Sequence, residues 1–242
     1  MNIVEEKTDY HYQDKNYDAY FYYDADIKGK RPGVIVLPEW WGLNDYSRSR
    51  AKQLAELGYA SIAIDVYGDG KQGNTPTEAQ ALANTYYTNL SLSKPVMDAA
   101  IEHFKTFSQV DDSKVAAIGY CFGGAFVLNA AKLGADLKGI VSIHGGLKGV
   151  APNKDLLKAK LLVCHGAADV FENDNVAGFH QEMDDAGIDY TFKEYPGAQH
   201  AFSNPIATEV GEKYNMPISY NAEADKNSWN DMKGFLDTLF KN

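Results

Sequence analysis

The stretch Val115–Phe126 reads VAAIGYCFGGAF, and the rest of the chain is organised around it. A short apolar run ends in Gly119, one reactive side chain follows at Cys121, and Gly123 and Gly124 lead into a helical pattern. Gly-x-Cys-x-Gly is typical of a sharp turn between a strand and a helix that exposes a nucleophile. Side chains in place of the flanking glycines would collide there, and the start of a helix favours a thiolate. The pattern predicts a cysteine nucleophile, with a buried structural cysteine as the alternative.

Composition and charge indicate an acidic globular chain. Hydrophobic residues make up 45% and charged residues 23% of the 242 residues, and this length fits one domain, 1–242. The formal net charge of −10 opposes nucleic-acid binding, which requires basic surfaces. No apolar run approaches the ~18 residues of a membrane span, and the first residues lack the pattern of a secretory signal. We expect a cytoplasmic protein without nucleic-acid or membrane partners.

The cysteines and histidines do not suggest a disulfide or a metal site. Cys121 lies in the turn and Cys164 in an apolar strand, which predicts reduced thiols. The six histidines show no ligand spacing such as His-x-x-x-His. We therefore expect no metal and no cofactor. His144 and His165 end strands near the proposed site, where we expect structural or supporting roles.

Apolar strands alternate with amphipathic helices along most of the chain. This alternation predicts an α/β fold with a mainly parallel, doubly wound sheet and helices on both faces. The tyrosine-rich residues 9–23, with a turn signal at 14–16, predict a hairpin at an antiparallel N-terminal edge, residues 1–24. Residues 203–222 are predicted to be a polar loop before a C-terminal helix.

Polar residues lie where ligands bind in such a sheet, beyond the carboxyl ends of the strands. The order of nucleophile, acid and histidine along the chain is that of α/β-hydrolases. His200 is expected to take the thiol proton and later to protonate the leaving group, while Asp169 fixes the imidazole tautomer. Backbone N–H groups at two positions would form an oxyanion hole. The triad candidates are Cys121, Asp169 and His200, and the oxyanion-hole candidates are Trp40 and Phe122.

The chain resembles the dienelactone hydrolase family, cysteine hydrolases of the α/β-hydrolase fold, from about Tyr20 to the C-terminus. The segments that carry the resemblance are LPEWWG at 37–42, DVYG at 65–68, GYCFGG at 119–124, HGAAD at 165–169 and GAQHAF at 197–202. The resemblance implies hydrolysis of a small-molecule ester or lactone through a thioester on Cys121. It also implies that Glu39 contacts the resting thiol and is displaced by substrate. A carboxylate that faces a cysteine opposes its ionisation.

The chain departs from the family at the two arginines that hold a substrate carboxylate in the founding enzymes. Asp69 and Asn204 stand at the corresponding positions, and no arginine follows Arg50. Bidentate carboxylate binding by guanidinium is therefore missing, and we expect a neutral or weakly polar substrate rather than a dianionic dienelactone. Candidates for substrate contact are Trp41, Tyr67, Lys71, Tyr120 and Phe202.

Other functions stay open alongside the ester hydrolase. Glutamine amidotransferases also use Gly-x-Cys-x-Gly but place glutamate two residues after the histidine, where this chain has Phe202. A cysteine amidase or peptidase fits the surroundings of Glu39 and Asp169 less well. A hydrolase fold that serves only as a binding module usually lacks one triad residue. The sequence leaves open the natural substrate and whether the protein is a monomer or a homodimer.

Overall fold

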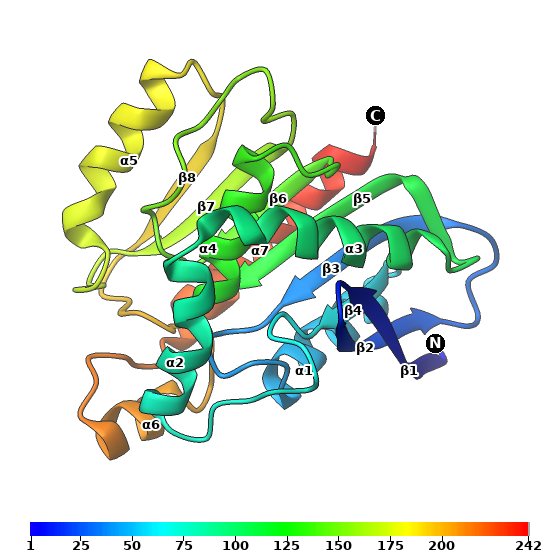
Figure 1. The fold of residues 1–242 in the computed structure, drawn as a ribbon, viewed down its shortest axis with the longest axis horizontal. Helices are drawn as coiled ribbons and strands as arrows, with labels where there is room; N and C mark the ends of the chain where they lie inside the picture. Colours follow the sequence, from blue (N-terminus) through cyan, green and yellow to red (C-terminus); the bar gives the residue numbers. More distant parts are fainter. Residues whose placement is uncertain (242) are drawn as a thin grey trace.

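All the strands in residues 1–241, the part of the chain that the structure describes, belong to one sheet. The structure is a computed structural model (Figure 1). The strands lie in the order β1-β2-β4-β3-β5-β6-β7-β8. Their bounds are Ile3–Tyr12 (β1), Lys15–Asp24 (β2), Arg31–Leu37 (β3), Ala60–Ile64 (β4), Val110–Tyr120 (β5), Gly139–Ile143 (β6), Lys160–Gly166 (β7) and Thr191–Tyr195 (β8).

The sheet is parallel from β4 to β8 and antiparallel at its N-terminal edge. There β1 pairs with β2, and β2 pairs with β4, in antiparallel register. Tyr12 faces Lys15, so the hairpin turn consists of Gln13 and Asp14 rather than residues 14–16. Gln13 adopts a φ of 53°, the left-handed conformation that a two-residue hairpin turn requires. The predicted mixed sheet with an antiparallel edge is confirmed.

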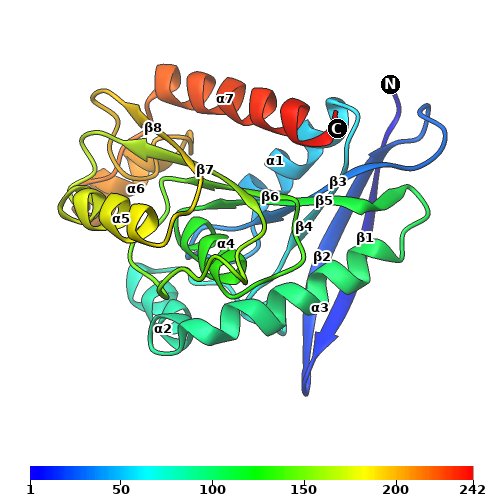
Figure 2. The same cartoon turned by 90° about the horizontal axis from the view of Figure 1, so that it is seen from above.

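Helices cover both faces of the sheet, as the alternation of strands and helices predicts (Figure 2). Seen from above, α1 and α7 lie on one side of the sheet, and α2, α3, α4 and α5 lie on the other. Within residues 1–241, no helix combines the length and the apolar character that a membrane crossing requires. The bounds are Asp45–Glu56 (α1), Pro76–Tyr87 (α2), Ser93–Lys105 (α3), Phe122–Lys132 (α4), Asn173–Asp185 (α5), Ala207–Tyr214 (α6) and Ala222–Phe240 (α7).

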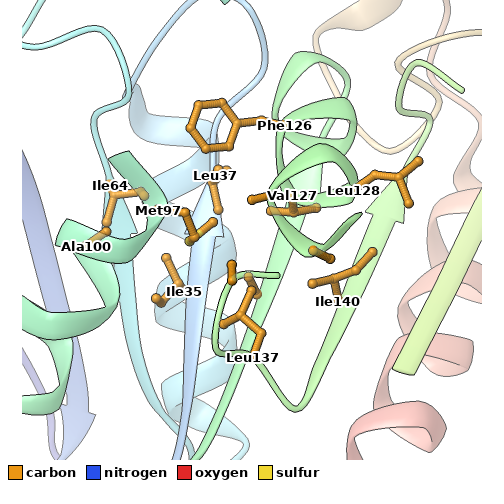
Figure 3. Close-up of a cluster of buried hydrophobic side chains, with 14 of the residues drawn as sticks. Ile35, Leu37, Ile64, Met97, Ala100, Phe126, Val127, Leu128, Leu137 and Ile140 are labelled. Atoms are coloured by element: carbon orange, nitrogen blue, oxygen red, sulfur yellow. The ribbon is translucent and has the colours of Figure 1, made fainter. Parts of the chain in front are cut away.

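The alternation of side chains along β3 divides the core into two clusters. Ile35 lies in one cluster with Met97 of α3 and Phe126 of α4 (Figure 3). Val34 and Val36 belong to the other, together with apolar residues of α1 and α7. Burying one such large aliphatic side chain stabilises a fold by about 1.5–3 kcal/mol. From Gly33 to Leu37, strand β3 is apolar because both its faces are covered, and this part pairs with Val115–Gly119 of β5 in regular parallel register.

The segment 203–222, predicted as a polar loop, contains helix α6. This helix buries only Ala207 and Gly211, and a Cβ at Gly211 would lie 2.4 Å from the carbonyl oxygen of Ile218. Two small residues give no apolar stripe, so the sequence pattern did not indicate a helix. The segment after α6 returns to the loop that follows β8, where Ile218 pairs with His200 in an isolated bridge.

The turn between β5 and α4 has the tight geometry that its glycines predict. Cys121 takes φ 52° and ψ −117°, a backbone conformation that non-glycine residues rarely adopt. A Cβ at Gly119 would lie 1.9 Å from the carbonyl oxygen of Gly123. A Cβ at Gly123 would lie 2.5 Å from the carbonyl oxygen of Pro38. Both positions therefore require glycine, and α4 begins directly after the cysteine.

We expect Gly119→Ala to destabilise the protein strongly, because the backbone of the turn cannot move away from the added methyl group without opening the turn. Overpacking typically costs about 1–3 kcal/mol, and we expect a loss at the upper end of that range in the free energy of unfolding by urea. Gly178→Ala is the matched control. Gly178 lies in α5 with no atom within 4 Å of its Cβ position, and helices favour alanine over glycine by about 1 kcal/mol. Equal stability of the two variants would contradict the steric account.

Candidate active site

The carboxyl ends of the parallel strands meet along one edge of the sheet, and the candidate residues follow them. From β3 the chain crosses to β4 on one side, whereas from β5 it continues to β6 on the other. A change of direction of this kind leaves a crevice in which open α/β sheets bind ligands. The residues that follow strand ends there are Glu39 after β3, Cys121 after β5, Asp169 after β7 and His200 after β8.

Cys121, His200 and Asp169 form a continuous hydrogen-bonded row. Cys121 Sγ lies 3.0 Å from His200 Nε2, and His200 Nδ1 lies 2.7 Å from Asp169 Oδ2. Asp169 is fully buried, and its Oδ1 accepts a hydrogen bond from the backbone N–H of Phe171 at 3.0 Å. A fixed carboxylate on Nδ1 keeps Nε2 directed at the sulfur, so that a proton can pass between them. The structure thus brings into contact the three residues predicted as a triad.

The surroundings of His200 favour its charged form. Burial lowers the pKa of His200, but the charge of Cys121 and the hydrogen bonds to Asp169 and Cys121 outweigh burial and raise that pKa well above its ordinary value. An imidazolium beside the sulfur is the arrangement that activates a cysteine nucleophile.

The two backbone N–H groups predicted to form an oxyanion hole, those of Trp40 and Phe122, lie in ordered parts of the backbone. Phe122 is the first residue of α4, where N–H groups have no partner within the helix. The N–H of Gly42 donates to the carbonyl oxygen of Glu39 at 3.1 Å, which fixes the peptide unit that carries the N–H of Trp40. The hydroxyl of Tyr67 donates to the Trp40 carbonyl oxygen at 2.9 Å and fixes the next peptide unit.

Glu39 is buried beside the row and is held by Asn204. Only 2% of Glu39 is exposed, and its Oε2 accepts a hydrogen bond from Asn204 Nδ2 at 2.6 Å. Burial raises the pKa of Glu39 to about 7, against the opposing effects of Asn204, His200 and Arg50. The resemblance implies a contact with the resting thiol, but within residues 1–241 the thiol of Cys121 is bonded to His200 and no hydrogen bond joins it to Glu39. Asn204 explains this difference from the family, because its side-chain amide already bonds the carboxyl group of Glu39.

Two of the predicted substrate contacts lie in the core. Tyr120 and Phe202 are fully buried. Tyr120 packs edge-on against Tyr46, and Phe202 packs against Tyr195, with ring centroids 5.3 and 5.4 Å apart. Because neither side chain offers a free surface, we correct the prediction that they contact substrate. Tyr120 directly precedes Cys121, so the alternation of side chains along β5 directs it into the sheet's other cluster.

The other predicted contacts differ in what they offer. Lys71 is exposed, and its Nζ lies 3.5 Å from Asp69 Oδ2, so a neighbouring carboxylate already offsets its charge. Only 4% of Tyr67 is exposed, and its ring centroid lies 5.4 Å from that of Phe122. Trp41 is partly exposed. Trp41 therefore stays a candidate contact, whereas the hydroxyl of Tyr67 bonds the loop that carries Trp40.

Two exposed aromatic side chains beside the row were missed at the level of sequence. Phe171 is 50% exposed, with its ring centroid 5.4 Å from that of His200. Tyr87 is 47% exposed, with its ring centroid 5.8 Å from that of Phe122. A signal was present for the first, because Val170 and Phe171 form an apolar pair in the loop directly after the acid. For Tyr87, no local sequence pattern indicates that the end of α2 lies near Cys121.

The remaining histidines near the site make hydrogen bonds to single polar side chains. His144 Nε2 lies 2.7 Å from Ser203 Oγ, and His165 Nε2 lies 2.9 Å from Asn173 Oδ1. Across the described residues 1–241, no three His, Cys, Asp or Glu side chains are grouped in a way that could hold a metal ion.

Comparisons with known proteins match the chain along nearly its whole length. The model of the dienelactone hydrolase family matches residues 17–240. A Synechocystis sp. protein named "Putative carboxymethylenebutenolidase" is 28% identical over 230 residues, which cover 88% of each chain. The solved structure of a dienelactone hydrolase-like promiscuous phosphotriesterase from metagenomic libraries has a TM-score of 0.90 and 32% identity, covering 99% of each chain. An α/β hydrolase from a deep-sea metagenome has a TM-score of 0.67 at 16% identity, covering 98% of this chain and 99% of that one. The predicted α/β-hydrolase fold is confirmed.

The raised pKa of Glu39 predicts a pH-dependent difference between the wild type and Glu39→Gln. The folded protein binds this proton up to a pH of about 7, whereas the unfolded chain releases it near 4.5, so the contribution of Glu39 to wild-type stability falls between these values and then stays level. We expect the unfolding free energy of the variant, minus that of the wild type, to grow by about 3 kcal/mol from pH 4.5 to 8. Urea unfolding at several pH values measures this, and a difference that does not change with pH would contradict it.

Proposed function

The chain belongs to the dienelactone hydrolase family, and we propose that it hydrolyses uncharged carboxylic esters or lactones through a thioester on Cys121. The observation that carries the proposal is the row in which Sγ lies 3.0 Å from His200 Nε2 and Nδ1 lies 2.7 Å from Asp169. A nucleophile, a base and a group that orients the base are the parts that acyl transfer requires.

In the first half-reaction the thiolate of Cys121 attacks the carbonyl carbon, and a carbon–sulfur bond forms. The electron pair of the carbonyl bond moves to oxygen, where the N–H groups of Phe122 and Trp40 stabilise the negative charge. The tetrahedral intermediate then collapses, the bond from carbon to the alcohol oxygen breaks, and His200 gives its proton to that oxygen. In a lactone the released hydroxyl stays attached to the acyl chain.

In the second half-reaction water attacks the thioester, and neutral His200 accepts a proton from it. The carbon–sulfur bond breaks, the carboxylic acid leaves, and the thiolate of Cys121 is restored beside the imidazolium. Asp169 carries no proton through the cycle. Its buried carboxylate orients the imidazole and stabilises the charged ring at both steps.

The charges near the row support a neutral substrate. The carboxyl group of Glu39 lies in the site, whereas the cations are already paired. Arg50 is buried, with its Nη2 2.5 Å from Asp225 Oδ1, and Lys71 pairs with Asp69 at 3.5 Å. Neither cation is free for the bidentate or point-charge binding that a substrate carboxylate needs.

The exposed aromatic rings support an apolar group on the substrate. Phe171 lies against His200, and Tyr87 lies against Phe122, so each flanks a residue of the proposed machinery. Large side chains that stay half exposed beside a site offer apolar area that a bound ligand can cover. We assign these rings to the acyl or the alcohol group of the ester.

A pair of matched esters tests the proposal. We expect initial rates to give a kcat/KM at least about 10-fold higher for 3-carbamoylphenyl acetate than for 3-carboxyphenyl acetate, because Arg50 and Lys71 are already paired with carboxylates and a factor of 10 corresponds to only about 1.4 kcal/mol. We expect Cys121→Ala to lose turnover of both. Cys164→Ala is the matched control, because Cys164 is buried away from the row and bonded to Tyr195.

Each outcome distinguishes between the functions that the sequence left open. Turnover that survives in Cys121→Ala would exclude this nucleophile. Faster hydrolysis of the carboxylate ester, or of a carboxylate-bearing dienelactone, would contradict the charge argument. Tight binding of esters without turnover by the wild type would indicate a binding module, and hydrolysis of amides but not esters would indicate an amidase or peptidase.

Neutral phosphotriesters are a second candidate substrate class. The structural neighbour with 32% identity over 99% of each chain is described as a promiscuous phosphotriesterase. A neutral triester meets the same charge requirement as a neutral ester. Attack by Cys121 would form a sulfur–phosphorus bond and release an aryl alcohol protonated by His200, after which water would cleave the sulfur–phosphorus bond.

Release of aryl alcohol from a neutral aryl dialkyl phosphotriester tests this second activity. We expect several equivalents per Cys121, at a kcat/KM below that for the neutral carboxylic ester, because the planar ester needs less room. Release that stops at one equivalent, with the added mass on Cys121, would show a dead-end phosphoryl enzyme and exclude turnover.

A further inference from the structure

His144 lies directly behind the candidate nucleophile, and the proposed mechanism does not use it. It follows the last residue of β6, is completely buried, and takes a φ of 40°. Its backbone N–H donates to the carbonyl oxygen of Cys164 at 2.8 Å. A left-handed conformation at a bulky residue is strained and persists only where surrounding contacts impose it. Beyond this backbone bond, both ring nitrogens of His144 lie at hydrogen-bond distance from a partner.

The hydrogen bonds of His144 define its tautomer. The backbone N–H of Cys121 donates to Nδ1 at 3.1 Å, so Nδ1 is an acceptor and carries no proton. The ring proton is therefore on Nε2, which lies 2.7 Å from Ser203 Oγ and donates to it. The Cys121 N–H also points to the carbonyl oxygen of Ile143 at 3.0 Å, so the bond to the ring is one arm of a shared pair.

Ser203 is a fixed point in the loop that carries His200. It lies three residues after His200 and is buried. Its carbonyl oxygen accepts a hydrogen bond from Arg50 Nη2 at 2.6 Å, and its hydroxyl lies 2.7 Å from that of Tyr46. Because Arg50 fixes the backbone of Ser203, the serine gives the imidazole of His144 a rigid partner.

The surroundings keep the ring neutral. Burial, the charge of His200 and the charge of Arg50 lower the pKa of His144 well below its ordinary value, with a smaller opposing effect of a backbone carbonyl. The rings that face it, at centroid distances of 5.1–6.0 Å, are His200, Phe202 and Tyr120. A proton on Nδ1 would face the N–H of Cys121, so the geometry itself excludes the charged form.

We propose that His144 is a positioning residue that ties the turn of Cys121 to the loop of His200 through one path, from the Cys121 N–H through the imidazole to the hydroxyl of Ser203. This inference rests on the proposed function. Cys121 and His200 follow strands that are not neighbours, β5 and β8. Their contact of 3.0 Å therefore depends on links between segments, and this path is the one that reaches the backbone of Cys121 itself. A misplacement of about 1 Å can reduce a rate by about 10²-fold.

His144→Asn and Ser203→Ala each remove the link from one end. Asparagine tolerates a left-handed φ, and its Oδ1 can replace Nδ1 as the acceptor for Cys121, but it has no donor that reaches Ser203. We expect kcat on the neutral ester to fall by about 10- to 100-fold in each single variant, with KM changed by less than about twofold. The double variant should lose no more than the larger of the two single losses, because one path cannot be broken twice.

The alkylation rate of the Cys121 thiol provides a readout that does not require turnover. A looser contact with His200 leaves less thiolate at a given pH, so the pH profile of iodoacetamide alkylation should move to higher pH by the same amount in both single variants. Cys121→Ala provides the background from Cys164. Should His144→Asn fail to fold, as thermal unfolding would show, Ser203→Ala alone carries the test.

Two controls separate the link from a general loss of buried polar groups. His165→Asn removes a buried histidine from the end of the neighbouring strand β7, where its partner is Asn173. Tyr46→Phe removes the other hydroxyl bonded to Ser203 but leaves His144 in place. Both should keep kcat within about threefold of the wild type and leave the alkylation profile unmoved.

Two results would overturn the inference. One is a set of single losses in kcat that multiply in the double variant, and the other is an unmoved alkylation profile in both single variants. Failure of the proposed function would give a different result. Cys121→Ala would still turn over the ester, whatever the effects of the His144 and Ser203 variants.

Discussion

The contact of α4 with the end of β3 is the constraint on which the site depends. Because Gly123 has no side chain, its backbone approaches the carbonyl groups of Leu37 and Pro38, where a Cβ would lie 2.5–2.9 Å from their atoms. The helix can then begin at the end of β5 and still lie against β3. This close approach brings the turn that carries Glu39 beside the turn that carries Cys121, before any hydrogen bond between side chains is considered.

Buried polar groups add a second level of order to this steric frame. Arg50 reaches Ser203 and Asp225, Asn204 reaches Glu39, and Asp169 bonds both His200 and a backbone N–H. Groups of this kind are costly to bury unless they are paired, so each pair accepts only a narrow geometry. The loop from His200 to Asn204 is consequently fixed at several points. In the proposed reaction, a cysteine and a histidine held in this way lose little entropy when substrate arrives.

Much of the fold and part of the candidate site could be predicted from the sequence. The turn at Cys121 was predictable because its steric requirement acts between residues four apart, Gly119 and Gly123. The order of strands and helices followed from hydrophobic periodicity. The grouping of Cys121, Asp169 and His200 followed from their order along the chain and from their places after strands. Helix α6 was missed because its buried residues are small. Tyr120 was wrongly predicted to contact substrate because it precedes Cys121, and adjacent residues of a strand point to opposite faces of the sheet.

The sequence by itself determined the sheet, the turn and the family, because each depends on residues close together in the chain or on a motif of fixed spacing. Only the tertiary structure decided that Glu39 bonds Asn204, 165 residues away, and that His144 bonds Ser203, 59 residues away. It also decided that Phe171 and Tyr87 flank the row. Contacts between distant segments depend on how strands are ordered in the sheet and how loops pack over its edge. Neither leaves a periodic pattern in the chain, so the partners of the buried polar groups can be read only from the folded protein.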